Sequence, residues 1–405
     1  MKASKQRFLL NFPVLLFFAI AMVASRAAMA GGPTNGEGSP ALPPAEAKPL
    51  LTFAAYGDIP YRIKLPDGRM DDEVLVKEIA PALRQRADIP FVIHLGDLSR
   101  PDYACSDEWL RQTNAFWKRE LVKPVFYTPG DNEWTDCDRK SLKVRQSEYA
   151  RLDRVRAILF GEPKTVSPAW KLAQTQQILN QDPQYSHPEE SLEAIRKVLA
   201  MGPQQFAEEW KYESQSRQPE NAIWWRDDVL FVTVHKVSTD DGRSEILLDE
   251  PRRAIALVNK RDRLNQQWLN RAFALAKKND AKAVVVATQL DPFDPASEGK
   301  NETKNENVAA YCLANPAYAG FCRQIESLSA GFGKPVLLLH GDTNAYCLDK
   351  PFGSAQNIWR LNAPGDYKVI DAVVIKVAPD DAAQPFQATG LLSGTPAPAV
   401  CDYSF

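Results

Sequence analysis

Residues 90–97 read Pro-Phe-Val-Ile-His-Leu-Gly-Asp, an apolar run typical of a β-strand that stops at Gly-Asp. Three more apolar runs stop in the same way, at Gly57-Asp58, Gly130-Asp131 and Gly341-Asp342. Because the carboxyl ends of parallel strands meet at one edge of an α/β sheet, we expect these carboxylates to lie close together. Ionised carboxylates at such distances repel one another unless a bound cation offsets their charge. The pattern therefore predicts a metal site.

The rest of the chain alternates between strand-like and helix-like stretches. A Gly-Asp pair after one strand is more often an ordinary turn, but here four of them close apolar runs. We expect strands over residues 50–56, 90–95, 124–127, 223–225, 229–234, 282–288, 335–339 and 367–377. We expect helices over residues 71–86 and 107–121 and around Trp268. This alternation indicates an α/β architecture with mixed sheets.

The N-terminus has the three parts of a secretory signal peptide. Basic residues open the chain, residues 8–23 are apolar apart from Asn11, and Ala28-Met29-Ala30 forms a small-x-small cleavage site. A membrane anchor is the alternative, but the apolar stretch is short and ends in a cleavage signal. We expect cleavage after Ala30, a secreted or periplasmic protein, and no membrane anchor once the signal is removed.

The charge of the expected mature chain argues against two classes of partner. Removing Lys2, Lys5, Arg7 and Arg26 with the signal reduces 49 basic residues to 45, against 51 acidic residues, a formal charge of −6. A general nucleic-acid or anionic-lipid binder needs a basic face, which this balance does not favour. We therefore expect no general nucleic-acid binding.

All six cysteines follow the predicted signal peptide, and an even number in an exported chain indicates disulfides. Six cysteines allow about 15 pairings, so the sequence leaves the connectivity open. The pairing we expect is Cys105–Cys137, Cys312–Cys322 and Cys347–Cys401. A cysteine zinc site is the weaker alternative, because the chain has no C-x-x-C spacing.

The predicted organisation has one principal domain. Residues 31–48 are rich in Pro, Gly and Ala and are expected to form a flexible linker, with the domain over residues 49–378. Over residues 140–220 the strand signal is lost and apolar residues recur at helical spacing, which predicts a helical insertion. Residues 379–405 are expected to form a C-terminal tail.

The order of the strand-end motifs resembles that of the calcineurin-like metallophosphoesterases over residues 50–377. The motifs are Gly57-Asp58, Gly96-Asp97, Gly130-Asp131-Asn132-Glu133, an apolar strand ending near Gln289, and His340-Gly341-Asp342-Thr343-Asn344. The resemblance implies a four-layer α-β-β-α sandwich with two metal ions between the sheets. It also implies that Asp97 bridges both ions, that Asp58 holds the first, and that Asp131 holds the second, where the family has Asn.

The chain departs from the family at most of its histidine ligands. Pro60 stands where the first motif has His, and Tyr61 is a substitute ligand that we consider. Thr288 or Gln289 replaces a later His, and the last motif has Asp342 and Asn344 in place of two histidines. The expected metal ligands are Asp58, Asp97, Asp131, Gln289, Asp342 and Asn344. A set so rich in oxygen suits Mg²⁺, Mn²⁺ or Ca²⁺ better than zinc or iron.

The expected catalytic residues are Asn132, His235 and His340. Asn132 stands where the family has a His that assists the leaving group, and an amide can position a phosphate but is no general acid near neutral pH. His235, His340 or solvent would then assist. The function expected is an exported metal-dependent phosphoesterase that hydrolyses small-molecule phosphate mono- or diesters. The alternative is a metal- or ligand-binding protein on the same fold without catalysis.

Overall fold

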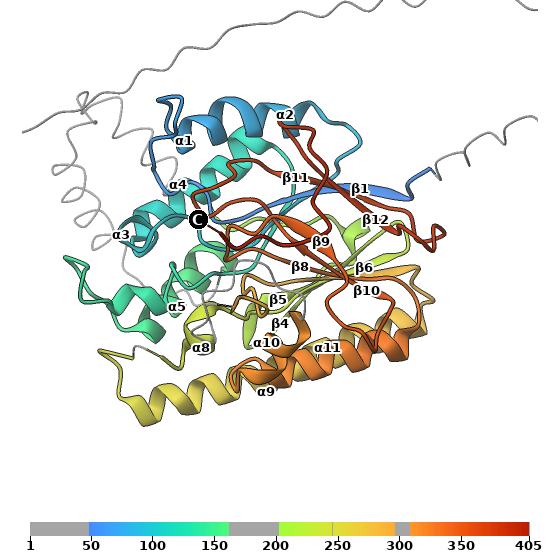
Figure 1. The fold of residues 1–405 in the computed structure, drawn as a ribbon. Helices are drawn as coiled ribbons and strands as arrows, with labels where there is room; N and C mark the ends of the chain where they lie inside the picture. Colours follow the sequence, from blue (N-terminus) through green and yellow to red (C-terminus); the bar gives the residue numbers. More distant parts are fainter. Residues whose placement is uncertain (1–47, 162–201, 245, 296–307, 405) are drawn as a thin grey trace, which may run out of the picture. The chain divides into compact units, whose positions relative to one another are not determined.

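The computed structural model describes residues 48–161, 202–244, 246–295 and 308–404 (Figure 1). The predicted signal peptide and almost all of the predicted linker lie outside these ranges. The described strands form a five-stranded sheet, in the order β12-β11-β1-β2-β3, and a seven-stranded sheet, in the order β4-β5-β6-β7-β8-β10-β9. None of the helices in these ranges combines the length and the apolar character that a membrane span requires.

The five-stranded sheet delivers three of the Gly-Asp pairs to one edge. Its strands are β1 (Leu51–Tyr56), β2 (Val92–His94), β3 (Val125–Tyr127), β11 (Val373–Val377) and β12 (Phe386–Gly390). β2 lies between β1 and β3 and is parallel to both. The loops that carry Asp58, Asp97 and Asp131 therefore leave the sheet on the same side.

The seven-stranded sheet brings the remaining candidate ligands to its own strand ends. Its strands are β4 (Glu213–Gln215), β5 (Gln218–Arg226), β6 (Val229–Thr233), β7 (Ala283–Ala287), β8 (Val336–His340), β9 (Cys347–Asp349) and β10 (Ile358–Asn362). β6, β7, β8 and β10 run parallel. Gln289 follows β7 and Asp342 follows β8 at the same edge.

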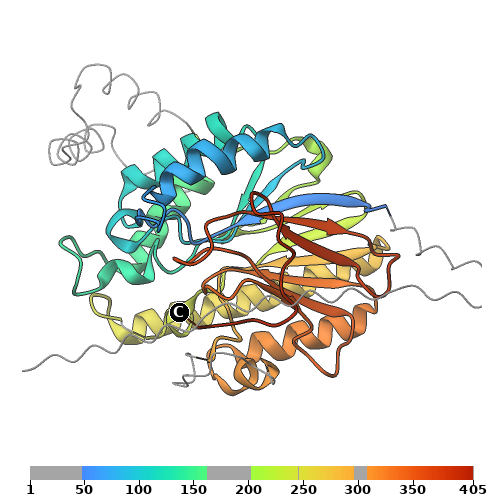
Figure 2. The same cartoon turned by 45° about the horizontal axis from the view of Figure 1, so that its top comes forward.

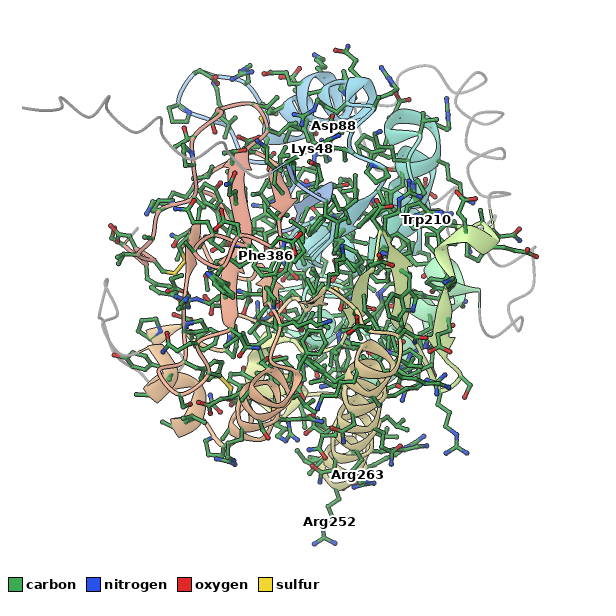
Figure 3. The ribbon with its side chains drawn as sticks, turned by 90° about the vertical axis from the view of Figure 1, so that its right-hand side faces the viewer. Lys48, Asp88, Trp210, Arg252, Arg263 and Phe386 are labelled. Carbon is green, nitrogen blue, oxygen red and sulfur yellow. A yellow bond between two sulfur atoms is a disulfide. The ribbon has the colours of Figure 1, made fainter. Side chains whose placement is uncertain are left out.

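The main core lies between the two sheets, where one face of each strand is buried against the other sheet. Phe126 on β3 stacks on Trp224 on β5, with ring centroids 3.8 Å apart. Phe53 on β1 meets Phe231 on β6 edge-on at 5.2 Å. Side chains from both sheets fill the space between them (Figure 3).

Helices cover the outer face of each sheet, which completes the expected four-layer α-β-β-α arrangement (Figures 1 and 2). The five-stranded sheet is covered by α1 (Asp71–Val74), η1 (Leu75–Ile79), α2 (Ala80–Gln85), α4 (Asp107–Phe116) and η2 (Trp117–Leu121). The seven-stranded sheet is covered by α9 (Pro251–Lys278), α10 (Val308–Ala314) and α11 (Ala319–Phe332). The exposed Arg252 and Arg263 of α9 point away from the sheet (Figure 3).

The shorter helical segments are α3 (Pro101–Ala104), η3 (Thr135–Asp138), α5 (Glu148–Val155), η4 (Arg156–Phe160), η5 (Glu208–Trp210) and α8 (Ser238–Gly242). Three of them, α5, η4 and η5, lie in the segment expected to be a helical insertion. The same segment also contains β4 and the start of β5, so its end belongs to the sheet rather than to an insertion. Residues 162–201 of that segment lie outside the described residues.

The C-terminal segment is part of the domain, which corrects our expectation of a tail after residue 378. β12 extends the five-stranded sheet by pairing antiparallel with β11. Further on, Cys401 and Tyr403 are buried. The sequence missed this strand because Phe386–Gly390 is short and carries little of the apolar alternation that marks a strand.

All three expected disulfides are present: Cys105–Cys137, Cys312–Cys322 and Cys347–Cys401. The first joins the loops that follow β2 and β3, close to the strand ends that carry Asp97 and Asp131. The third joins the C-terminal segment to β9, across a sequence separation of 54 residues. Disulfides of this kind fit an oxidising compartment.

Val122 ends η2 in a left-handed conformation, with φ 55°, and its side chain is 62 % exposed. A β-branched residue is strained there, and its exposed side chain has little packing to lose. We expect Val122→Gly to raise the free energy of unfolding by about 1 kcal/mol, measured by urea denaturation. A matched Val76→Gly change inside the exposed face of η1 should lower it, and stabilisation by both changes would contradict this explanation.

Candidate metal centre

Each strand-end glycine is required because another loop passes where its side chain would be. A Cβ atom at Gly130 would lie 2.0 Å from Oδ1 of Asp97, and one at Gly341 would lie 2.3 Å from Oδ2 of Asp58. The aspartates that follow β1, β2 and β8 adopt left-handed turns, with φ of 55° at Asp58, 51° at Asp97 and 76° at Asp342. The Gly-Asp pattern thus allows the loops of both sheets to converge on the same carboxylates.

Asp97 lies at the centre of the hydrogen bonds on the side of the five-stranded sheet. Its Oδ1 accepts a 3.3 Å bond from the Asn132 backbone N–H. Its Oδ2 accepts bonds from the Asn132 side-chain amide at 2.9 Å and from the Tyr61 hydroxyl at 2.8 Å. The same hydroxyl is 3.4 Å from Oδ1 of Asp58. Tyr61 therefore lies between the two acids for which the family resemblance implies metal binding.

Gln289 connects the acids on the other side. Its amide nitrogen donates to Oδ1 of Asp131 at 3.2 Å and to Oδ1 of Asp342 at 2.9 Å. The Asp342 backbone N–H donates to Oδ2 of Asp58 at 3.1 Å. These contacts bring Asp58, Asp97, Asp131, Gln289 and Asp342 into one cluster, together with Asn132. Asn344 follows Asp342 closely in sequence and is buried. Its amide nitrogen has no hydrogen-bond partner among the described residues.

The cluster gathers buried carboxyl groups that no basic side chain of the described residues contacts. Burial raises the pKa of Asp58, Asp97 and Asp342 well above the ordinary range, and the neighbouring carboxylates raise it further. Burial likewise raises the pKa of Glu133 to about 7. Within the described ranges, no Lys or Arg forms a hydrogen bond or ion pair with the four strand-end aspartates. Buried carboxylates arranged in this way fit a divalent cation.

The spacing of the acids limits how an ion could be held. Among the described residues, the only three Cys, His, Asp or Glu ligand atoms within 4.8 Å of one another belong to Cys347, Asp349 and Cys401. Two of these are joined in a disulfide, so that group is no metal site. No three of the strand-end acids offer ligand atoms that close together, so oxygens of neutral side chains such as Tyr61, Gln289 and Asn344 would have to complete a shell.

The two candidate histidines are buried and engaged elsewhere. Nδ1 of His235 lies 2.8 Å from Oε1 of Glu220, and burial lowers the pKa of His235 to about 4. Nδ1 of His340 lies 3.1 Å from the Gly341 carbonyl oxygen, and burial lowers its pKa as well. In the part of the chain that the structure describes, neither ring contacts a strand-end aspartate. Each leaves a buried Nε2 without a hydrogen bond.

Three residues beside the cluster were not predicted from the sequence. The Ser238 hydroxyl donates to Oδ2 of Asp131 at 2.6 Å, from the left-handed turn α8. The Asp291 backbone N–H donates to Oδ2 of Asp342 at 3.1 Å. The Asp366 backbone N–H donates to the Asp58 carbonyl oxygen at 3.3 Å, and burial raises the Asp366 pKa to about 6. Such contacts depend on turns with no periodic signal.

The turn around Asp366 also corrects the strand expected over residues 367–377. φ is positive at Gly365, Asp366 and Tyr367, which is incompatible with a strand, and β11 begins only at residue 373. A Cβ atom at Gly365 would lie 2.6 Å from the Gly57 carbonyl oxygen. The turn therefore packs directly against the turn that carries Asp58.

The strand ends of two sheets meet here over buried acids, an arrangement typical of metal-dependent α/β proteins. A comparison with known families identifies the family. The model of the calcineurin-like phosphoesterase family matches residues 51–287. The chain belongs to this family, whose members are phosphoesterases that bind divalent metals. The matched residues include Asp58, Asp97 and Asp131 and end before Gln289, Asp342 and Asn344. No curated protein matches the chain.

Proposed function

We propose that this protein is an exported phosphoesterase that hydrolyses small-molecule phosphate mono- or diesters at a dinuclear metal site. The observation that carries the proposal is the convergence of four strand-end aspartates that have no basic partner in the described part of the chain. Their oxygen-rich surroundings favour Mg²⁺, Mn²⁺ or Ca²⁺ over zinc or iron. The N-terminal sequence and the three disulfides support export.

The proposed ligands divide between the two sheets. Asp97 would be shared between the ions, with Asp58 and Tyr61 on one side and Asp131, Gln289, Asp342 and Asn344 on the other. Divalent ions in such a site polarise the phosphoryl oxygens and lower the pKa of water. The Asn132 backbone N–H and side-chain amide both donate to Asp97, which supports the proposal that this amide orients a phosphate oxygen.

Protonation of the leaving group is the weak point of this site. His235 and His340 are buried, and burial holds both rings neutral, so neither has a proton to donate near pH 7. Of the three donors considered, His235, His340 and solvent, only solvent is left. We therefore propose that the enzyme prefers esters with good leaving groups, which need little protonation.

A second candidate function rests on the surroundings of the same acid cluster. Because no imidazole contacts the acid cluster in the described residues, the site can bind a metal ion or an anionic ligand through it without catalysing hydrolysis. The two candidates share the fold and the metal site, and they differ only in turnover.

The experiment that separates them is an activity assay of the protein without residues 1–30. The metal-free protein is reloaded with Mn²⁺ or Mg²⁺ and tested on aryl phosphate monoesters and diesters, with Asp97→Asn as the control. Metal-dependent turnover that the control lacks supports the enzyme. Mn²⁺ binding with no turnover above the control supports the binding protein.

The Tyr367 ring lies beside the proposed site, next to Tyr61. Its side chain is 48 % exposed, and its ring centroid lies 4.7 Å from that of Tyr61. We expect Tyr367→Ala to raise KM about fivefold for aryl phosphates and to change KM little for alkyl phosphates, because a stacked ring is worth about 1 kcal/mol. Tyr367→Phe should behave like the wild type. Equal effects on both substrate classes would show that the ring does not contact the leaving group.

A further inference from the structure

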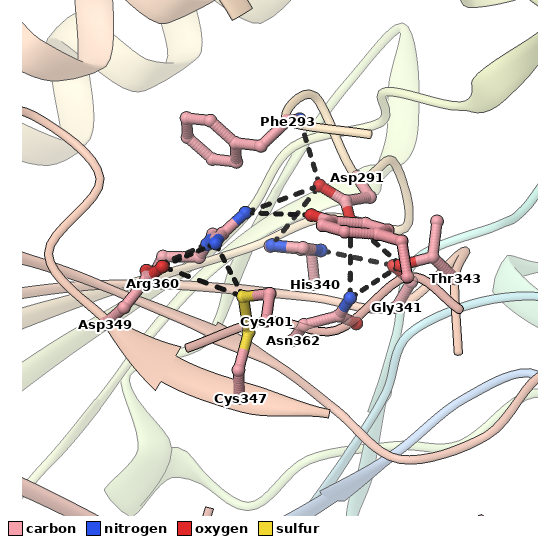
Figure 4. Close-up of a disulfide and its surroundings, with 11 residues drawn as sticks. Asp291, Phe293, His340, Gly341, Thr343, Cys347, Asp349, Arg360, Asn362 and Cys401 are labelled. Carbon is pink, nitrogen blue, oxygen red and sulfur yellow. Dashed lines mark hydrogen bonds and ion pairs between the residues drawn. A yellow bond between two sulfur atoms is a disulfide. The ribbon is translucent and has the colours of Figure 1, made fainter. Parts of the chain in front are cut away.

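We propose that the C-terminal segment completes the metal centre, because Tyr403 and Arg360 hold Asp291, whose backbone N–H donates to Asp342. The proposal rests on the proposed metal site. The segment lies after residues 51–287, the part of the chain that the family model matches. Figure 4 shows Arg360 and His340 beside Asp291, and Cys401 beside Arg360.

Asp291 is the residue through which these contacts reach the cluster. Its backbone N–H donates to Oδ2 of Asp342, at 3.1 Å. Its own Oδ2 accepts three bonds, from the Thr343 hydroxyl at 2.8 Å, the Asn362 amide at 3.2 Å and the Tyr403 hydroxyl at 3.0 Å. Asp291 therefore ties Tyr403 to the turn that carries Asp342, across 112 residues of sequence.

Arg360 determines which way the Tyr403 hydroxyl points. The guanidinium is fully buried, and its Nη1 donates to the Tyr403 oxygen at 3.1 Å. Because arginine has donors only, the hydroxyl must accept from Arg360 and use its single proton toward Asp291. Arg360 is itself held by two bonds to Asp349, at 2.9 and 2.5 Å, and by the Phe293 ring, 4.7 Å away.

The disulfide between Cys347 and Cys401 holds Tyr403 in place. Cys401 is two residues from Tyr403, and its sulfur lies 2.6 Å from Nη2 of Arg360. Its partner Cys347 belongs to β9, which pairs with the strand that carries Arg360. The covalent bond thus fixes the donor, Tyr403, relative to the arginine that orients it.

These contacts do more than fill the core. An apolar residue at position 403 would pack in the same space but would leave one donor fewer on a buried carboxylate. Partners that orient metal ligands through a second residue change metal affinity by about 10- to 100-fold when they are removed. The Tyr403 hydroxyl should therefore affect metal affinity as well as stability.

The first test measures Mn²⁺ affinity of the metal-free protein without residues 1–30 by calorimetry. We expect Tyr403→Phe to weaken Mn²⁺ binding at least about tenfold. The matched control is Tyr346→Phe, which removes a hydroxyl that donates at 3.4 Å to Thr395 in the same C-terminal region but does not touch Asp291. Wild-type affinity in Tyr403→Phe, or an equal loss in the control, would overturn the proposal.

The second test removes the disulfide. The double change Cys347→Ser and Cys401→Ser should weaken Mn²⁺ binding, and adding Tyr403→Phe should then weaken it little further, because the hydroxyl has already lost its position. Removal of the Cys312–Cys322 disulfide is the control and should leave the affinity unchanged. Additive losses would contradict the proposal. Wild-type protein that binds Mn²⁺ without turnover would refute the phosphoesterase and leave this proposal standing, whereas no Mn²⁺ binding would refute both.

Discussion

Asp97→Asn is expected to lower kcat/KM for an aryl phosphate by more than about 100-fold. Residues that merely orient metal ligands account for about 10- to 100-fold, and Asp97 is the proposed ligand of both ions. An amide has one acceptor oxygen in place of two, whereas Asp97 uses both oxygens to accept three bonds, two from Asn132 and one from Tyr61. Calorimetry with Mn²⁺ and steady-state kinetics together measure the loss.

Asp131→Asn is the matched control for this prediction. It makes the same chemical change in the same cluster, but Asp131 stands where the resemblance places Asn in the family, so an amide should be tolerated. Its Oδ1 can still accept from Gln289, as Asp131 does at 3.2 Å. We expect this variant to keep metal-dependent turnover within about tenfold of the wild type. Equal losses in the two variants would contradict the central position given to Asp97.

The metal-free protein is expected to lose stability as the pH rises from about 7.5 to about 8.5. Burial and mutual repulsion raise the pKa of Asp58, Asp97 and Asp342 well above normal, and burial raises that of Glu133 to about 7. Above pH of about 6.5 the unfolded chain has lost these protons while the folded chain retains some. Folding then requires proton uptake, and stability falls by about 1.4 kcal/mol per pH unit for each retained proton.

Within this pH range, the buried groups with lowered pKa do not make stability rise with pH. Burial lowers the pKa of His94, His235 and His340, which makes stability rise with pH up to the ordinary histidine pKa of about 6.5. Glu220 has a lowered pKa, largely through Arg156, so its contribution is lost only in acid. By about pH 7.5 all four of these groups have nearly the same charge in both states, since the unfolded histidines are then deprotonated as well.

Mn²⁺ should reverse the trend, because it binds the ionised carboxylates of the folded state. We expect Mn²⁺ to raise the melting temperature by more at pH of about 8.5 than at about 7.5, as measured by differential scanning calorimetry. Asp342→Asn removes one of the raised carboxyls and should flatten the metal-free profile. A metal-free melting temperature that rises across this window would contradict the buried-charge account.

The location of the site could be predicted from the sequence because it rests on a local pattern. An apolar strand that ends in Gly-Asp identifies both the sheet edge and the carboxylate, and parallel strands bring such ends together. This is why the convergence of Asp58, Asp97, Asp131 and Asp342 could be expected without a structure, while their binding of metal stays a prediction. Close approach of the neighbouring loops explains the glycines: a side chain at Gly130 would overlap Asp97.

The supporting contacts could not be predicted, because they join segments that are distant in sequence. Asp291 and Tyr403 meet across 112 residues, and Ser238 reaches Asp131 across 107 residues from a left-handed turn. Neither contact leaves a periodic signal in the chain. The histidines show the converse problem, since His235 and His340 follow strands as ligands would, but their rings face Glu220 and the Gly341 carbonyl instead.

The short strands at the sheet edges were not predicted, for a related reason. A short strand at a sheet edge is specified by the strand that it pairs with as much as by its own residues. β12 therefore has little signal of its own, although its pairing with β11 and the disulfide at Cys401 make the C-terminal segment part of the fold. The same holds for β4, which pairs with β5 at the edge of the other sheet.

The most direct test of the metal site is a calorimetric titration of the metal-free protein, without residues 1–30, with Mn²⁺ at pH of about 8, where the carboxyls ionise most readily. The account predicts two ions bound per chain in the wild type and loss of tight binding in Asp97→Asn. Failure to bind Mn²⁺, or purified protein that holds stoichiometric zinc or iron instead, would contradict it.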